Sequence, residues 1–239
     1  MKLNKVHCIQ VEELNSSIKS FSFQFYDTSN SFSFIPGQWI DLYLEDNIHS
    51  PCGGYTLASS CLKKDGVEIV VKESSHPIAQ ALHKKLKIGD DVWISEAQGR
   101  FTTLVPTVTP LLMIAGGIGI TPMLGITKSI LDFCKEGKQK YPFTLLHSVR
   151  LESDLIRKFF FEAQSNIKLF HYVAHLSRKS SRIDLPQLKA ILEQMNKISP
   201  GANISKVMLC GPGAMNADMK SHLLKLGLNS EQISSEKWH

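Results

Sequence analysis

The chain has 239 residues, of which 43% are hydrophobic and 21% charged, and its mean hydropathy is −0.07. This composition, with 12 Phe and 15 Gly, is typical of a folded globular protein and argues against disorder. The length fits one large domain or two domains of about 100–150 residues each. The longest apolar run, 111–120, is interrupted by glycines and is too short for a membrane span, which needs about 20 residues.

The cysteines indicate a reduced, intracellular chain. Their number is odd, no Cys-x-x-C pair occurs, and they are spread over the sequence at Cys8, Cys52, Cys61, Cys134 and Cys210. This spacing argues against a disulfide framework, a zinc knuckle and a plant-type iron–sulfur cluster. The N-terminal residues contain no signal core or presequence, so we expect a cytoplasmic protein, although removal of an organellar presequence would leave a similar start.

The net charge of +5 is unevenly distributed. Residues 1–106 hold 10 Lys and Arg against 12 Asp and Glu, a net of −2, whereas residues 107–239 hold 17 against 10, a net of +7. No basic run exceeds two residues and no Lys/Arg stripe alternates with aromatic residues, which argues against a nucleic-acid partner. The basic second half favours a small polyanionic ligand such as a nucleotide.

Short apolar or alternating segments between turn residues predict strands in the first half of the chain. They cover residues 6–11, 20–25, 39–44, 67–72 and 92–95. One helix is expected at 77–86, where Pro77 takes the first helical position. Many short strands at this spacing predict a small antiparallel barrel.

After a Pro-rich joint at 105–110 the pattern changes to apolar strands that alternate with helices. The expected strands cover residues 111–115, 143–148, 169–174 and 206–210, and the expected helices cover 121–134, 154–163, 184–195 and 213–226. This alternation predicts an open, doubly wound parallel sheet. We therefore expect two domains, an all-β antiparallel barrel over 1–106 and an α/β domain over 107–239.

A glycine-rich turn follows the strand at 111–115. Gly116, Gly117 and Gly119 lead to Thr121, the expected helix N-cap, and to Pro122, the expected first helical residue. Glycines let backbone N–H groups approach a ligand closely, and the helix N-terminus adds the positive end of its dipole. The segment predicts a phosphate cradle, but a tight strand-to-helix turn without a ligand has the same pattern.

A second strand ends in glycines at residues 210–213, Cys-Gly-Pro-Gly. In open α/β folds, ligands bind at the carboxyl edge of the sheet, where the strand order switches. Two glycine-bearing strand ends in one parallel sheet together favour a nucleotide site at that edge.

Six short motifs occur in a fixed order along the chain. They are FIPGQW at 34–39, GDDV at 89–92 with GRF at 99–101, the turn at 115–122, LLHSVR at 145–150, CGP at 210–212 and EKW at 236–238. In this order they resemble the ferredoxin–NADP reductase superfamily over nearly the whole chain. The residues GGYT at 53–56, His76-Pro77 and the EKW motif are most similar to the oxidoreductase NAD-binding domain-containing proteins.

This resemblance implies a flavin-binding barrel, holding FAD or FMN, and a second domain that binds NAD(P)H and delivers its hydride to the flavin. It implies catalytic roles for Thr56, whose hydroxyl lies near the reactive flavin nitrogen, and for Cys210 and Glu236, beside the nicotinamide. The cofactor-binding residues that it implies are Gly53, Gly54, Tyr55, Thr56, Leu57, Gly116, Gly117, Ile118, Gly119, Ile120, Thr121, Pro122, Cys210, Gly211, Pro212, Met215 and Trp238.

Two sites depart from the family's pattern. Gly53 stands where the family has an Arg that clamps a flavin phosphate, and His76 and Ala79 stand where it has Gly and Ser or Thr. The candidates to replace these phosphate anchors are Lys72, His76, Arg100 and the helix N-terminus at Pro77.

Ser177 and Arg178 follow the third strand of the second domain, where NADP-specific members of the superfamily place Ser-Arg for the 2′-phosphate. A solvated basic turn would have the same sequence. No acidic residue stands at this turn to hold the ribose diol of NAD, which favours NADP.

Together these residues predict a flavin-dependent NAD(P)H oxidoreductase that passes electrons to an external acceptor, either a protein or a small molecule. The alternatives are a degenerate, non-catalytic NAD(P)H-binding module, which Gly53 and Ala79 favour, and a redox-partner subunit that is active only in a complex. No metal site is expected, because His171 and His175 would lie about 13 Å apart on one strand face. No Gly-x-Ser-x-Gly elbow supports a hydrolase.

Overall fold

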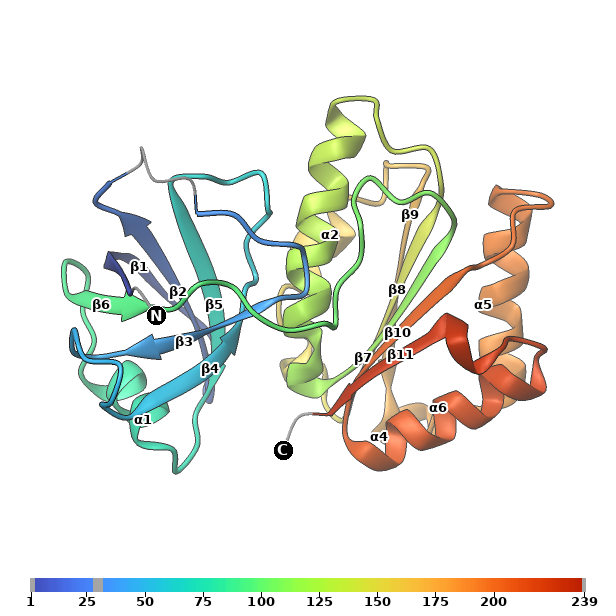
Figure 1. Ribbon diagram of the computed structural model, residues 1–239. Coiled ribbons are helices and arrows are strands. Elements are labelled where there is room, and N and C mark those ends of the chain that lie inside the picture. Colours follow the sequence, from blue (N-terminus) through green and yellow to red (C-terminus); the bar gives the residue numbers. More distant parts are fainter. Residues whose placement is uncertain (1–2, 28–31, 238–239) are drawn as a thin grey trace. The chain divides into compact units, whose positions relative to one another are not determined.

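The computed structural model describes residues 3–27 and 32–237, and the chain divides into two compact units (Figure 1). Unit 1 comprises Met1–Thr103 and Leu124–Asp132, and unit 2 comprises Leu104–Met123 and Phe133–His239. Each unit has its own sheet and its own hydrophobic core. Helix α2 (Ile120–Lys135) contributes its middle to unit 1, so the units do not follow the sequence division at residue 106 throughout.

Unit 1 contains a six-stranded antiparallel sheet in the order β4-β3-β6-β1-β2-β5. The strands are β1 (Asn4–Asn15), β2 (Ile18–Phe25), β3 (Trp39–Tyr43), β4 (Cys52–Thr56), β5 (Gly66–Lys72) and β6 (Asp91–Ile94). A bridge between Leu57, just after β4, and Ile69 of β5 joins the two edges of the sheet. The sheet therefore closes on itself, which confirms the predicted antiparallel barrel.

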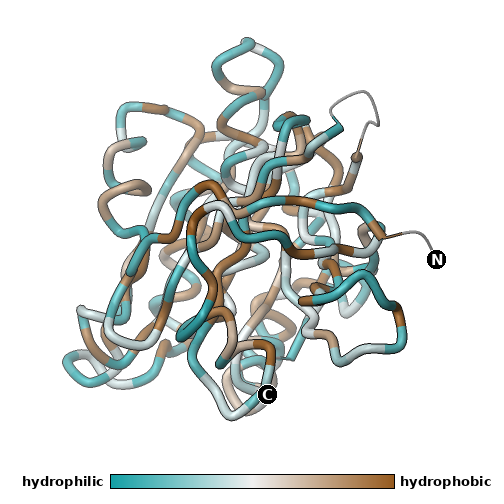
Figure 2. Tube along the Cα trace, turned by 90° about the vertical axis from the view of Figure 1, so that its left-hand side faces the viewer, coloured by the Kyte–Doolittle hydropathy of each residue, from teal (hydrophilic) through white to brown (hydrophobic). Residues whose placement is uncertain are grey.

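The core of unit 1 follows from the alternation of apolar and polar residues along its strands, which Figure 2 shows as alternating brown and teal segments. On β2, Phe21 and Phe23 are fully buried, whereas Ser22 between them is only partly buried. Helix α1 (Pro77–Lys84) adds Ile78, Ala79 and Leu82 to this core. The helix predicted at 77–86 is confirmed, and it ends two residues earlier than expected.

Unit 2 contains a five-stranded parallel sheet in the order β11-β10-β7-β8-β9. Its strands are β7 (Leu111–Gly116), β8 (Phe143–Val149), β9 (Phe170–Leu176), β10 (Lys206–Gly211) and β11 (Ile233–Lys237). Besides α2, its helices are α3 (Lys158–Glu162), α4 (Ser177–Ser180), α5 (Leu185–Ile198) and α6 (Gly213–Lys225), with 3-10 turns η1 (Gly117–Gly119), η2 (Glu152–Asp154) and η3 (Ser230–Gln232).

Helices cover both faces of this sheet, as a doubly wound fold requires. On one face, α5 and α6 bury Leu188 and Leu223 in a core that includes Leu146 of β8. On the other face, Phe161 of α3 stacks on Tyr172 of β9 with ring centroids 4.9 Å apart. The predicted α/β architecture is therefore confirmed.

Three elements differ from the expectations drawn from the sequence. The helix expected at 154–163 is interrupted because Arg157 adopts a left-handed φ of 59°, which separates η2 from α3. Strand β4 was missed because it contains Gly53 and Gly54, which have low strand propensity. Strand β11 was missed because it is short and mostly polar.

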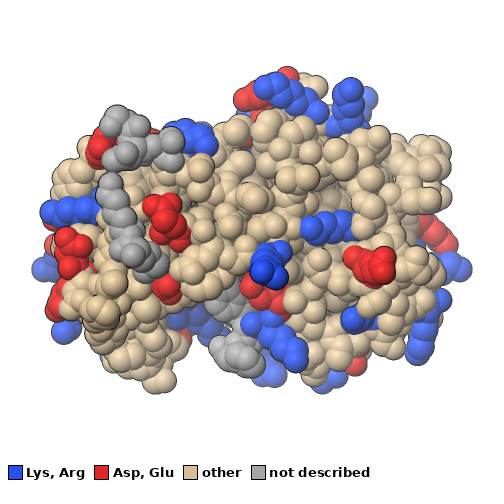
Figure 3. All heavy atoms as spheres, viewed as in Figure 1, with Lys and Arg blue, Asp and Glu red and all other residues tan. Residues whose placement is uncertain are grey.

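Within the described residues, no helix is both long enough and apolar enough to cross a bilayer. Figure 3 shows that, on the face it draws, basic and acidic side chains are scattered among uncharged ones over both units.

The middle of α2 is fixed within unit 1 by close backbone contact and by polar bonds. Lys128 pairs with Glu68 of β5, and the Ser129 hydroxyl accepts the Cys61 N–H at 3.0 Å. A Cβ atom built on Gly125 would lie only 2.3 Å from the Leu57 carbonyl oxygen. The close approach of α2 to the Leu57 backbone therefore requires glycine at position 125.

We expect Gly125→Ala to destabilise the protein by about 1–3 kcal/mol, because the new methyl group must displace backbone atoms of unit 1. Urea unfolding measures this change in the free energy of unfolding. Gly213→Ala is the matched control, since its Cβ would meet only Lys237 side-chain atoms at 3.9 Å. Equal stabilities of the two variants would contradict the role given to Gly125.

Candidate functional site

The carboxyl ends of β7 and β10 lie side by side in the parallel sheet of unit 2, with Ala115 opposite Cys210. From β7 the chain continues to β8 and β9 on one side, whereas β10 and β11 lie on the other side. The strand order therefore switches between β7 and β10. Open α/β sheets form a ligand-binding crevice at such a point, so the two glycine turns lie where a nucleotide site is expected.

Glycine is required at this edge because the two strand ends touch through their backbones. A Cβ atom on Gly119 would lie 2.2 Å from the Cys210 carbonyl oxygen, and one on Gly116 would lie 2.6 Å from the Met215 sulfur. Gly117 has a φ of +54° and open space around it. The turn thus exposes the backbone of Gly117 in front of α2, whereas Ile118 is half-buried and Gly119 is buried.

The helix after this turn begins earlier than the sequence indicated. The turn η1 runs directly into α2 at Ile120, and Gly116 occupies the N-cap position of the turn. The prediction that Thr121 is the N-cap is therefore wrong, and its hydroxyl instead donates to the Ile118 carbonyl at 3.2 Å. Pro122 lies in the first turn of α2 rather than at its first position, and its missing N–H costs little there.

This correction strengthens the fit to a phosphate group. The Ile120 N–H bonds back to the Gly117 carbonyl within the turn. Gly117 and Ile118 open the turn, and the first N–H groups of a helix have no carbonyl one turn earlier to bind. Such N–H groups, with the helix dipole behind them, are a common anion-binding arrangement.

Cys210 and Glu236 are direct neighbours across the β10–β11 register. Cys210 is fully buried, and burial raises the pKa of the half-buried Glu236 carboxyl above its ordinary value. Gly211 ends β10, and Pro212 and Met215 follow it at the start of α6. The structure therefore brings together the predicted residues of the second glycine turn and the predicted carboxylate.

Asn216 completes this edge and was missed in the sequence. It lies in the first turn of α6, and its side-chain amide donates to the carbonyls of Gly211 at 3.3 Å and Glu236 at 2.8 Å. It thereby fixes the end of β10 to the end of β11. The sequence offered no signal for it, because a polar residue after a glycine turn is common on a helix surface.

Ser177 and Arg178 lie at the carboxyl end of β9, in the single helical turn α4. The Ser177 hydroxyl donates to the Val149 carbonyl at 3.1 Å, and the Arg178 side chain is exposed. The two residues share the carboxyl edge of the sheet with the glycine turns. They lie two strands away from β7.

In unit 1, the predicted flavin residues 53–56 lie on β4, and Leu57 follows the strand. Thr56 is buried, and its hydroxyl has no hydrogen-bond partner among the described residues. Tyr55 is half-buried, and burial raises the pKa of its hydroxyl to about 12. Gly54 is exposed, and Leu57 is fully buried in the core.

At position 53, where the resemblance would place an arginine, the Tyr55 ring occupies the space that a side chain would need. The Tyr55 ring folds back over Gly53, so that a Cβ atom there would lie 2.7 Å from the Tyr55 hydroxyl and 2.8–2.9 Å from its ring carbons. Any side chain at position 53 would have to displace this ring. Gly53 and Tyr55 therefore form a pair in which the tyrosine occupies the space next to the glycine.

The other candidate phosphate anchors in unit 1 differ in exposure. Lys72 and His76 are exposed, and His76 precedes α1 without forming a capping bond. Arg100 is also exposed. Ala79 is 3% exposed and its methyl group is part of the core, so it does not face a ligand. Trp238 lies outside the described residues.

The residues present fit the two implied cofactors to different degrees. The unpartnered Thr56 hydroxyl fits a hydrogen bond to a flavin ring, and the exposed backbone of η1 fits a diphosphate. Position 53 does not fit a phosphate clamp, because it has no side chain and the Tyr55 ring covers it.

Among the described residues, no group of three or more His, Cys, Asp and Glu side chains gathers in a way that could hold a metal ion.

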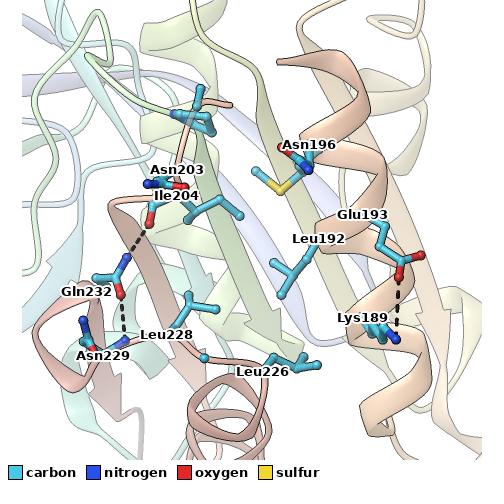
Figure 4. A pocket seen from close by; sticks show the side chains of 14 residues that line it. Lys189, Leu192, Glu193, Asn196, Asn203, Ile204, Leu226, Leu228, Asn229 and Gln232 are labelled. Atoms are coloured by element: carbon cyan, nitrogen blue, oxygen red, sulfur yellow. Dashed lines mark hydrogen bonds and ion pairs between the residues drawn. The ribbon is translucent and has the colours of Figure 1, made fainter. Parts of the chain in front are cut away.

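A cavity of about 610 Å³ lies at the opposite, amino edge of the sheet in unit 2 (Figure 4). Its wall includes Pro110 and Ile204, which precede β7 and β10, and Leu192 of α5. Gln232 in this wall is already bonded to the Ile204 carbonyl and the Asn229 N–H. The cavity is therefore separate from the glycine turns and contains none of the predicted site residues.

Two family models match the chain in the order that the sequence predicted. The Oxidoreductase FAD-binding domain matches residues 5–103, and the Oxidoreductase NAD-binding domain matches residues 113–221.

Similar proteins extend this finding to the whole chain. The chain is 28% identical over 229 residues to oxidoreductase NAD-binding domain-containing protein 1 of Danio rerio, and the match covers 87% of this chain and 82% of that protein. It is 26% identical over 236 residues to the carnitine monooxygenase reductase subunit of Escherichia coli K12, and this match covers 98% of this chain and 68% of that protein. A ferredoxin NADP+ reductase from Neisseria gonorrhoeae, solved with FAD and NADP, has the same fold, with a TM-score of 0.77 and 22% identity over 99% of both chains.

We expect Glu236→Gln to stabilise the protein at pH 7 and to leave its stability unchanged near pH 4. Because the folded pKa of Glu236 is raised, the folded state binds the proton more tightly than the unfolded state. The wild type therefore loses stability as the pH rises from the unfolded pKa through the raised folded value, and the Gln variant lacks this loss. Urea unfolding at several pH values measures it.

The exposed Glu231→Gln, only five residues away on η3, serves as the control and should show the pH dependence of the wild type. A Glu236→Gln variant whose stability follows the wild type in parallel from pH 4 to pH 8 would show that burial does not perturb this carboxyl.

Proposed function

We propose that this chain, which belongs to the ferredoxin–NADP reductase superfamily, is an NAD(P)H-dependent flavoprotein reductase that passes electrons to an external acceptor. The chain carries an FAD-binding and an NAD-binding oxidoreductase domain. The observation that carries the proposal is the pair of glycine turns at the strand switch point of unit 2, where Cβ atoms on Gly119 and Gly211 would meet the backbone of the other strand end. The names of its relatives support an electron-transfer role, because they include a monooxygenase reductase subunit.

In unit 2, we assign the η1 turn and the start of α2 to the diphosphate of NAD(P)H. The exposed backbone at Gly117 and the N–H group of Ile118 supply hydrogen-bond donors. Arg178 is the candidate for a 2′-phosphate, because its guanidinium is exposed at the same edge of the sheet, whereas the Ser177 hydroxyl is bonded to Val149. These residues favour NADP over NAD.

The nicotinamide end of the nucleotide is assigned to the edge formed by β10 and β11. Cys210 lines it through its backbone, since the residue is fully buried, and Glu236 offers a carboxyl with a raised pKa. Asn216 holds the two strand ends together and so fixes the position of Glu236. This edge would orient the nicotinamide rather than react with it.

In unit 1, we assign the Thr56 hydroxyl and the Tyr55 ring to the flavin. A bound flavin would accept the hydride and supply electrons to the acceptor. The described residues offer the buried Thr56 hydroxyl no partner, and a flavin ring would supply one. His76, exposed ahead of α1, and Lys72 are the candidates to contact the flavin phosphates in place of an arginine.

A second candidate function is a non-catalytic NAD(P)H-binding module. The pairing of Gly53 with the Tyr55 ring favours it, because that pairing removes the position from which the family's arginine binds a flavin phosphate. Unit 2 would then bind the nucleotide without hydride transfer. A redox-partner subunit is the third candidate, and it differs by requiring a second polypeptide for activity.

The visible spectrum of the isolated protein separates these candidates. A reductase gives a yellow protein, as isolated or after addition of FAD or FMN, whose flavin absorbance bleaches when NADPH or NADH is added without oxygen. Ferricyanide then restores the absorbance and supports turnover. A colourless protein that binds NADPH but takes up neither flavin identifies the non-catalytic module, and bleaching followed by turnover only with a co-purified protein identifies the partner subunit.

Thr56→Val tests the assignment of its hydroxyl. Removing a buried hydroxyl without a partner should raise the stability of the flavin-free protein by about 1 kcal/mol. With flavin bound, the same change should slow flavin reduction by NAD(P)H about tenfold, because the ring loses a hydrogen bond. Thermal unfolding and stopped-flow absorbance measure the two effects.

Thr127→Val on α2 is the matched control, since its hydroxyl is also buried without a partner. It should change stability in the same direction and leave flavin reduction unchanged. If Thr56→Val reduces the flavin as fast as the wild type, Thr56 does not contact the flavin.

A further inference from the structure

His147 is a fully buried polar residue in the sheet of unit 2. It lies on β8, in register with Ala115 of β7 and Ala174 of β9, whose small side chains leave room for an imidazole ring on that face. Its Nε2 atom lies 3.2 Å from the carbonyl oxygen of Gly117, the first residue of η1. The ring thus reaches from the sheet to the glycine turn.

This hydrogen bond fixes the proton on one ring nitrogen. A carbonyl oxygen only accepts, so Nε2 must carry the proton and Nδ1 must hold a lone pair. Nδ1 is buried and has no partner among the described residues. Burial lowers the pKa of His147 to about 4, so the ring is neutral at physiological pH. Burying Nδ1 without a hydrogen bond costs free energy that an apolar side chain would not cost. The hydrogen bond from Nε2 to the turn acts against this cost.

The Gly117 carbonyl in turn fixes the direction of the next N–H group. The carbonyl of Gly117 and the N–H of Ile118 belong to one planar trans peptide group and point in opposite directions. The His147 ring and the Ile120 N–H both bond to this carbonyl, so the Ile118 N–H is directed away from His147. Gly117 itself has a positive φ and no atoms near the place of a Cβ, so these hydrogen bonds, and not side-chain packing, restrain the peptide.

We propose that His147 is a positioning residue for nucleotide binding: by holding the Gly117 carbonyl, it orients the Ile118 N–H toward the diphosphate of NAD(P)H. It does not contact the nucleotide itself. The inference rests on the proposed function, because it presupposes that the η1 turn binds a diphosphate. It adds a buried side chain from a neighbouring strand to a site otherwise built from backbone.

Calorimetric titration with ADP-ribose, which carries the diphosphate but no nicotinamide, tests the role of His147 without requiring turnover or flavin. His147→Leu should weaken ADP-ribose binding about tenfold, the loss expected when one oriented hydrogen bond is removed. His147→Gln should restore binding to within about threefold of the wild type, because its side-chain amide retains an N–H donor at a similar reach.

His171→Leu on β9 is the matched control. Its Nδ1 atom is also buried without a partner, but its Nε2 faces the Gln194 side chain rather than the glycine turn. This variant should bind ADP-ribose like the wild type. Equal binding by wild type and His147→Leu, or failure of His147→Gln to bind better than His147→Leu, would overturn the inference.

A measurement on the wild type covers the case in which His147→Leu does not fold. Nitrogen-15 NMR should show His147 as the neutral Nε2–H tautomer from pH 5 to pH 8, and ADP-ribose should shift the His147 Nε2–H and Ile118 N–H signals. A proton on Nδ1, or an Ile118 signal unmoved at saturation, overturns the inference. If the wild type does not bind ADP-ribose or NAD(P)H at all, it is the nucleotide site of the proposed function that fails.

Discussion

The contact between two strand ends in unit 2 is the constraint on which the candidate site depends. The Cys210 carbonyl occupies the space where a side chain of Gly119 would begin, so the backbones after β7 and β10 meet directly. That contact leaves no room for a side chain at position 119, and Gly117 exposes its backbone in front of α2. Asn216 joins this edge to β11, because its side-chain amide donates hydrogen bonds to the carbonyls of Gly211 and Glu236. The proposed phosphate site depends on the glycines of the turn, and the position of Glu236 depends on Asn216.

Unit 1 presents the opposite situation, because there a missing side chain is compensated by its neighbour. The Tyr55 ring covers Gly53, and the Thr56 hydroxyl beside it is buried without a partner. A hydroxyl in that state is unfavourable in the flavin-free protein, and a ligand that accepts its hydrogen bond removes the cost. Unit 1 thus offers a hydrogen bond to a flavin ring through Thr56, but no side chain at position 53 for a flavin phosphate. Competition between FAD, FMN and riboflavin would measure that difference directly.

Much of the fold could be predicted from residue patterns, and the failures have physical causes. Apolar runs such as 111–115 indicated strands, and the helical pattern over 184–195 indicated a helix, since burial acts locally. The structure adds that Asp184 and Gln187 cap that helix. Arg157 broke a periodic helix by a backbone angle that no pattern records. Thr121 looked like an N-cap, but the glycines before it were already helical. The roles of His147 and Asn216 depend on the carbonyls of Gly117 and Glu236, which lie 30 and 20 residues away and which spacing alone does not reveal.

The strand order also has a consequence for how the protein acquires its site during folding. Strands β7, β8 and β9 follow one another along the chain and pair in that order, whereas β10 must return from far along the sequence to pair with β7. Pairings of such large sequence separation tend to slow folding. A chain with only β7–β9 assembled lacks the β10 side of the proposed crevice, so a nucleotide bound there would bind only the completed sheet. Such a nucleotide would stabilise the native state by mass action.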